Sequence, residues 1–242
     1  MRSLYLLALS TSLTVQAAET FTFDANHIKL LQQSAVGWGF VESGAPLVIL
    51  PGSFESNADI EESGCKPEAV VAALNLGKVS DSTATAKAQR YCAEMGKALD
   101  IALRFGEIAP GTYPLNWPLR DHKYGEQLAA VGLTKTMRKP TFTLQADHIK
   151  LLRGAVVWRD TTAIDGKRPY GDMTYYFYDM SELLGRQNTP KGKDGYSKDI
   201  EAKLEQLHFE TQPALQVFLR EARFKPGRYT RQGSSYGWVQ AQ

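Results

Sequence analysis

The sequence predicts an α+β protein, mainly helical, made of two tandem copies of a small unit of helix, hairpin, helix, long helix and short strand. The first reason is a repeated block: residues 21–31 read FTFDANHIKLL, and residues 142–152 read FTLQADHIKLL. A second block, residues 98–113, returns at 214–229, and its two copies end in PGTY and PGRY. A Trp follows each copy of the first block, at Trp38 and Trp158. The same order at displacements of 121 and 116 residues predicts a tandem duplication.

The chain is expected to divide into a leader at 1–17, a first repeat at 18–128, a linker at 129–141 and a second repeat at 142–242. The leader has a basic start, an apolar run and small residues at its end, which is the pattern of a cleaved secretory signal. Its apolar run is too short to span a bilayer comfortably, so we expect export rather than membrane anchoring. The mature protein is therefore expected in the bacterial periplasm or outside the cell.

In the first repeat, Asp24 is a typical N-cap for a short helix at 25–33. Two apolar runs, 35–41 and 47–50, flank a turn that contains Gly and Pro and so predict a β-hairpin. The loop that follows at 51–64 is rich in Gly, Ser and Asn.

A second helix is expected to begin at Pro67 and to end at Gly77. Residues 80–82 then cap a long amphipathic helix that ends at Gly106, and residues 110–113 lead into a short strand. The inward face of the long helix is predicted from its three- and four-residue spacing to consist of Ala84, Ala88, Tyr91, Met95, Leu99 and Ala102.

The second repeat is expected to follow the same order. Its first predicted elements are a helix at 145–153, a strand at 155–158 and a helix from Asp172 to Gly185. A loop at 186–197 leads to a long helix after Ser197, which is expected to kink at Pro213. Strands at 226–229 and 236–238 complete the repeat.

The two cysteines, Cys65 and Cys92, both lie in the first repeat. In an oxidising compartment such a pair is more often a disulfide than two free thiols. Closing this loop would stabilise the fold by roughly 3–4 kcal/mol on the chain-entropy model. The alternative, a catalytic Cys92, would require a free thiol and a neighbouring base.

Composition and charge exclude few classes of function. The chain is 43% hydrophobic and 22% charged, which is ordinary for a globular protein. Residues 18–128 carry a net charge of −5, and residues 142–242 carry +3. Neither repeat has the dense basic stripe of a nucleic-acid-binding protein, so no nucleic-acid partner is expected.

Both repeats keep a histidine, His27 and His148, at the third position of their first predicted helix. A histidine that bonds to a neighbouring backbone group explains this placement, and we favour that interpretation over a catalytic one. None of the four histidines in the chain forms an i, i+4 pair or an HExxH motif, so neither a histidine-based metal site nor a cofactor is expected.

The most distinctive polar stretch is residues 165–172, DGKRPYGD, placed just before a predicted helix N-terminus. Arg168 and that helix end could bind an anion, with Asp165, Tyr170 and Asp172 beside them. In the alternative, the stretch is a rigid turn in which Arg168 pairs with one of the two aspartates. His148 is a further candidate member of this ligand site.

The second repeat contains HIKLL at 148–152, Trp158, IDGKRPYG at 164–171, LHFET at 207–211 and PGRY at 226–229. In these blocks it resembles a group of small, uncharacterised bacterial proteins. These proteins look like single-copy versions of the repeat. The first repeat keeps only the first and last of these blocks, and the resemblance implies no activity and no catalytic residue.

Two functional hypotheses follow. The first is an exported protein that binds and inhibits another protein, for example an immunity protein that neutralises a toxin delivered by type VI secretion, with loops 51–64 and 186–197 as candidate contacts. The second is an exported hydrolase with a site around Arg168, Tyr170, Asp172 and His148. A structural module of the cell envelope is a third possibility. The absence of nucleophile, phosphate-binding and dinucleotide motifs favours the first hypothesis.

Overall fold

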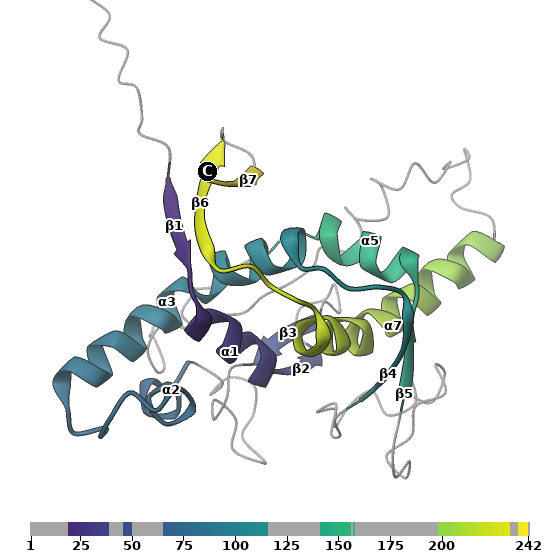
Figure 1. Cartoon of the computed structure of the whole chain (residues 1–242). Coiled ribbons are helices and arrows are strands. Elements are labelled where there is room, and N and C mark those ends of the chain that lie inside the picture. The colour runs from purple at the N-terminus through teal and green to yellow at the C-terminus, as the bar shows by residue number, and fades with distance from the viewer. Residues whose placement is uncertain are drawn as a thin grey trace, which may run out of the picture.

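A computed structural model describes residues 19–38, 46–49, 65–115, 141–155, 157, 198–232 and 237–241. The predicted leader, most of the predicted linker and the turn at 165–172 lie outside these residues. The described elements are β1 (Thr20–Phe23), α1 (Ala25–Gln33), β2 (Ala35–Trp38), β3 (Pro46–Ile49), α2 (Pro67–Leu74), α3 (Ser82–Phe105), β4 (Gly111–Pro114), β5 (Thr141–Leu144), α5 (Ala146–Gly154), α7 (Lys198–Glu221), β6 (Gly227–Gln232) and β7 (Gly237–Gln240), as Figure 1 shows. The predicted class, mixed α+β and mainly helical, is confirmed.

The short strands join the two repeats to each other. β1, the first strand of the first repeat, pairs with β6 near the end of the second repeat. β4, the last strand described in the first repeat, pairs with β5 at the start of the second repeat. Both pairs are antiparallel and lie in different parts of the molecule in Figure 1. β7 extends the first pair into a three-stranded sheet, and the predicted hairpin of the first repeat is present as β2 and β3.

The two strand pairs have the same register. Phe21 lies opposite Tyr229, and Phe142 lies opposite Tyr113. These two pairs correspond to each other when the displacements of 121 and 116 residues are applied. Glu107 and Arg223, which also differ by 116, form an isolated antiparallel bridge with each other, with N–H to O distances of 3.0 Å in both directions. Corresponding residues thus meet as across an approximate two-fold axis. The duplication and the repeat boundaries stay predictions.

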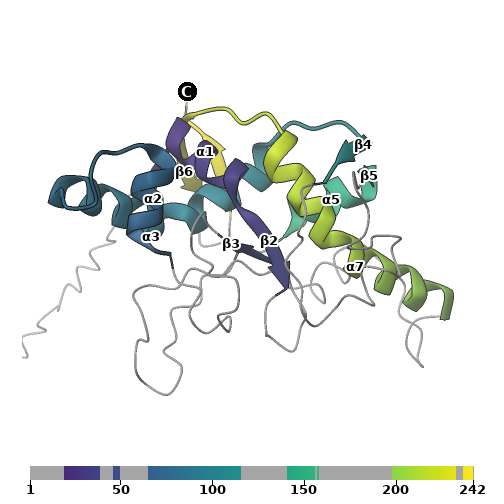
Figure 2. The ribbon, with the colours of Figure 1, turned by 90° about the horizontal axis from the view of Figure 1, so that it is seen from below.

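Among the residues that the structure describes, the buried apolar side chains form one cluster to which both repeats contribute, although the length of each repeat would allow separate cores. All six predicted inward positions of α3 are buried. In α7, Leu207, Leu215 and Phe218 are buried, and the helix continues past Pro213 to Glu221. α2 packs along α3, as Figure 2 shows. Because the core is shared, the two repeats stabilise each other.

A buried polar contact also crosses between the repeats. The indole Nε1–H of Trp238 on β7 donates to Oδ2 of Asp100 on α3 over 2.9 Å, and Nε–H of Arg104 donates to Oδ1 of Asp100, also over 2.9 Å. Burial raises the pKa of the Asp100 carboxyl above its usual range, against the opposing effect of Arg104. This bond fixes the C-terminal strand onto the long helix of the first repeat.

Two helix ends differ in detail from what the sequence predicts. α2 ends at Leu74 rather than near Gly77, because Asn75 takes a left-handed conformation with φ of 56° and caps the helix. Asn is one of the few residues other than Gly that adopt this conformation readily. α5 begins at Ala146, and Gln145, which was predicted to be inside the helix, is its N-cap.

Gly106 ends α3 as predicted, but its backbone is not left-handed. The reason for a glycine here is space: an added Cβ would lie 2.8 Å from Phe218 and 2.8 Å from Phe224. The chain leaves α3 where α7 and the connection from α7 to β6 pass close by. A residue without a side chain is needed for this close approach.

The repeated PGxY motif also has a structural explanation. The Tyr113 hydroxyl donates to the backbone O of Ala109 over 2.7 Å, and the Tyr229 hydroxyl donates to the backbone O of Lys225 over 2.8 Å. In each case the tyrosine closes the turn that precedes it, four residues back in the chain. The motif therefore shapes the entry into β4 and β6.

The predicted disulfide between Cys65 and Cys92 is confirmed, with 5.7 Å between the two Cα atoms. It ties Cys65, two residues before the start of α2, to the middle of α3. Disulfides persist in oxidising compartments, so the disulfide is consistent with a location outside the cytoplasm. The more specific prediction, the periplasm or the medium, stays a prediction. No helix among the described residues combines the length and the apolar character needed to cross a bilayer.

Candidate functional site

The histidines that both repeats keep lie at matching positions and make matching backbone bonds. His27 on α1 and His148 on α5 are each about 1% exposed. Nδ1 of His27 accepts the backbone N–H of Asp24 over 3.2 Å, and Nδ1 of His148 accepts that of Gln145 over 3.0 Å. Each ring therefore satisfies an N–H at the start of its own helix, in the manner of a capping box.

The other ring nitrogen of each histidine bonds to a glutamate on a long helix. Nε2 of His27 lies 3.1 Å from Oε2 of Glu94 on α3, and Nε2 of His148 lies 2.8 Å from Oε2 of Glu210 on α7. Because Nδ1 accepts a hydrogen bond in both rings, Nε2 carries the proton and donates it to the carboxylate. Each repeat thus contains one buried histidine–glutamate pair that joins its first helix to its long helix.

Sequence reasoning identified the histidines but missed the glutamates. Glu94 and Glu210 differ by 116 residues, the displacement of the second repeated block, and they stand four residues before its start in both copies. A search of the repeats for shared polar residues would have found them. The phenylalanine three residues before each N-cap, Phe21 or Phe142, packs on the corresponding histidine, with ring centres 5.1 and 5.2 Å apart.

The first pair belongs to a larger polar network that the second pair does not match. The Tyr91 hydroxyl donates to Oδ2 of Asp24 over 2.9 Å and accepts from the side-chain amide of Asn26 over 2.7 Å. Oδ1 of Asp24 accepts the backbone N–H of Asn26 and of His27, and it also lies 3.0 Å from Nδ1 of His27. The displacements of 116 and 121 residues give the corresponding residues of the second repeat: Leu207 for Tyr91, Gln145 for Asp24 and Asp147 for Asn26.

The protonation states follow from burial and from these bonds. Burial lowers the pKa of His27 below its usual range, although the neighbouring carboxylates of Asp24 and Glu94 favour the charged ring. Burial by itself would raise the pKa of Glu210, but the hydrogen bonds from His148 and Gln206 outweigh it and hold that pKa below its usual range. In the folded protein, burial therefore favours the neutral ring of His27, and the hydrogen bonds to Glu210 favour its ionised carboxylate.

This arrangement is suited to holding helices together rather than to general acid–base chemistry. A catalytic histidine must reach a reacting group with at least one free ring nitrogen. Here both nitrogens of each ring are engaged, and almost none of either ring is exposed. The interpretation of His27 and His148 as residues that bond to the neighbouring backbone is supported by these contacts.

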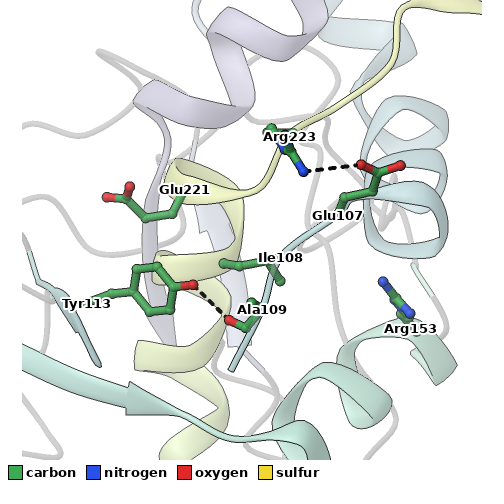
Figure 3. A pocket seen from close by; sticks show the side chains of 7 residues that line it. All are labelled: Glu107, Ile108, Ala109, Tyr113, Arg153, Glu221 and Arg223. Atoms are coloured by element: carbon green, nitrogen blue, oxygen red, sulfur yellow. Dashed lines mark hydrogen bonds and ion pairs between the residues drawn. The ribbon is translucent and has the colours of Figure 1, made fainter. Parts of the chain in front are cut away.

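An open cleft of about 490 Å³ lies beside the Glu107–Arg223 bridge (Figure 3). Its described lining consists of Glu107, Ile108, Ala109, Tyr113, Arg153, Glu221 and Arg223.

The charged groups in this cleft are mostly engaged with each other or with the backbone. Glu107 lies 3.7 Å from Arg223, Glu221 lies 2.7 Å from Arg220, and Arg153 donates to the backbone O of Gly106 over 3.1 Å. The described lining includes no histidine or cysteine.

The structure places only part of the predicted ligand site. His148 is buried in the pair described above, and its role in ligand binding stays a prediction. Asp165, Arg168, Tyr170 and Asp172 lie outside the described residues, as do the candidate contact loops at 51–64 and 186–197. Among the residues that the structure describes, no group of three or more His, Cys, Asp or Glu side chains is arranged to hold a metal ion.

Comparisons with protein-family models, with curated proteins and with solved structures found no match to this chain.

Proposed function

We propose that this chain is an exported protein that binds and inhibits another protein in the periplasm. The observation that carries the proposal is the state of the two repeated histidines. His27 and His148 are the residues best suited to catalysis that both repeats keep, yet both are about 1% exposed and both are bonded through each ring nitrogen. The histidines that the repeats share therefore stabilise the fold, and we assign the function to residues on the surface.

The disulfide and the shared core support the same proposal. An inhibitor must hold its contact surface in one conformation, because ordering a surface on binding reduces the affinity. The Cys65–Cys92 disulfide and the strand pairs between the repeats restrict the described scaffold in this way. The disulfide also fits a protein that folds in an oxidising compartment.

Within this class, we propose an immunity protein that protects its own cell from a toxin delivered by neighbouring bacteria, with type VI secretion as the route. Such a protein acts by covering or plugging an active site, and this requires a complementary surface but no reactive residue. The proposal rests on the predicted export and on the structural use of the shared histidines.

The test uses the mature chain, residues 18–242 with its disulfide formed, as bait in extracts of the organism that makes it. The same chain, reduced, alkylated and unfolded, is the control for non-specific capture. We expect one partner at near-equal amounts on the native bait only. When exported alone, that partner should arrest growth, and co-export of this chain should restore growth. If no partner is retained, or if the retained partner is harmless in the periplasm, the proposal is wrong.

A further inference from the structure

We infer that this chain can pair with a second copy of itself by exchanging its repeats, so that the first repeat of one molecule completes the second repeat of the other. The interaction surface is the pair of strand joints, β1 with β6 and β4 with β5. The partner here is a second copy of this chain, and exchange does not depend on the proposed function.

The first ground is that each joint uses one strand from each repeat. In β1·β6, residues Thr20 to Phe23 face Thr230 to Gly227, and in β4·β5 residues Gly111 to Pro114 face Leu144 to Thr141. No strand pairing is described between the first and last strands of the same repeat. A repeat taken from a second molecule would offer the same strand edges in the same register.

The second ground is the bridge between corresponding residues. Glu107 and Arg223 exchange two backbone hydrogen bonds with each other, as residues on a two-fold axis do. An interface of this kind is self-complementary. It closes equally well whether the two repeats belong to one chain or to two.

The third ground is the covalent connection. Residues 115–140 connect β4 to β5, and the strand residues at the two ends of this connection, Pro114 and Thr141, lie opposite each other. The disulfide lies within the first repeat and therefore does not oppose exchange. The exchanged dimer can thus re-form the described contacts between the repeats. The monomer carries the entropy cost of closing the connection into a loop, and the dimer carries the entropy cost of bringing two molecules together. The free energies of the two states differ mainly through these two costs.

This difference sets the concentration at which exchange appears. A connection of this length holds its two ends at an effective concentration on the order of a millimolar. At about 1 µM the intramolecular joint should therefore dominate. Refolding at about 1 mM should give a substantial fraction of exchanged dimer, which then persists on dilution while the chain stays folded.

The experiment uses residues 18–242 with the substitutions Thr112→Cys and Thr143→Cys. These two side chains are exposed, lie opposite each other across β4 and β5, and have their hydroxyl oxygens 3.0 Å apart. Equal amounts of unlabelled and ¹⁵N-labelled chains are mixed in denaturant, refolded at both concentrations and oxidised. Mass spectrometry then reads the peptide that joins positions 112 and 143.

At the high concentration we expect a substantial fraction of cross-linked peptides with one labelled and one unlabelled arm, with half of the total as the value for complete exchange, and at the low concentration almost none. Thr22→Cys with Arg228→Cys reports on the other joint in the same way and is the second variant if the first does not refold. Size-exclusion chromatography should show twice the monomer mass for the high-concentration sample. The inference is overturned if neither pair of substitutions gives mixed peptides at the high concentration.

Discussion

Nε2 of His148 lies 2.8 Å from Oε2 of Glu210, and the same bond recurs between His27 and Glu94 at 3.1 Å. In both repeats a helix of nine residues is fixed to a helix of twenty-four residues through this bond. The repeated HIKLL block therefore has a physical role: its histidine caps its own helix with one nitrogen and docks that helix with the other.

Removing the His148 side chain should lower the free energy of unfolding by about 3 kcal/mol, because it leaves a cavity and a carboxylate without its donor. Glu210→Gln should cost about 1–2 kcal/mol, since the partner remains polar but loses its charge. Glu205→Gln, on the exposed face of the same helix, is the matched control and should change little. Urea denaturation measures all three. Equal effects of the substitutions at 205 and 210 would contradict the role assigned to the pair.

Stability should fall as the solution becomes more acidic than about pH 6.5, the ordinary pKa of histidine. The pKa of His27 is lowered by burial, so the unfolded chain binds this proton at a higher pH than the folded chain does. Burial lowers the pKa of His208 as well, and this residue contributes with the same sign. Denaturation midpoints between pH 8 and pH 5 test this, and a flat profile would contradict it.

A second loss should begin below about pH 4.5, the ordinary pKa of a glutamate. Against the effect of burial, hydrogen bonds from His148 and Gln206 hold the pKa of Glu210 below that value in the folded protein. The ionised Glu210 therefore stabilises the fold at pH values above about 4.5, and this stabilisation disappears as Glu210 becomes protonated at lower pH. Comparing Glu210→Gln with the unsubstituted chain between pH 5 and pH 3 isolates this part. The difference in unfolding free energy between the two proteins should shrink as the pH falls.

Reducing the Cys65–Cys92 disulfide should lower the free energy of unfolding by about 3–4 kcal/mol, the loop-closure value for a separation of 27 residues. The measurement is a thermal or urea midpoint with and without a reductant. The double variant Cys65→Ala and Cys92→Ala is the control, and its midpoint should not respond to the reductant. An unchanged midpoint in the reduced native chain would count against a stabilising disulfide.

Gly106→Ala should destabilise the fold by about 1–3 kcal/mol, because the new methyl group would overlap Phe218 and Phe224. Gly111→Ala is a matched control, since the nearest atom to its added Cβ lies at 3.5 Å. The two variants are compared by urea denaturation. If both lose the same stability, close packing at the end of α3 is not the reason for Gly106.

The elements that the sequence predicts best are those with local signals. Asp24, which starts α1, and the three- and four-residue spacing along α3 act within one helix, so a single stretch of sequence contains the information. The exception at Asn75 is also local: the helix stops at the first residue that accepts a left-handed backbone, two positions before the expected glycine.

The pairing of strands could not be predicted in this way. Both repeats contain a TFT strand and a PGxY strand, so the strands could pair within a repeat or between repeats with the same side chains facing each other. The choice depends on how the long helices pack, which is a property of the whole chain. The pairing of His148 with Glu210 was missed for a similar reason, since the two residues are 62 positions apart.

If the mature chain captures a toxin, titrating the activity of that toxin with the mature chain tests most directly whether this chain acts by binding. We expect the activity to fall linearly and to reach its minimum at one molecule of this chain per molecule of toxin, with no dependence on the time of incubation after binding is complete. Inactivation by far less than an equal amount of this chain, increasing with time, would show turnover. That result would contradict the binding account and favour an exported enzyme.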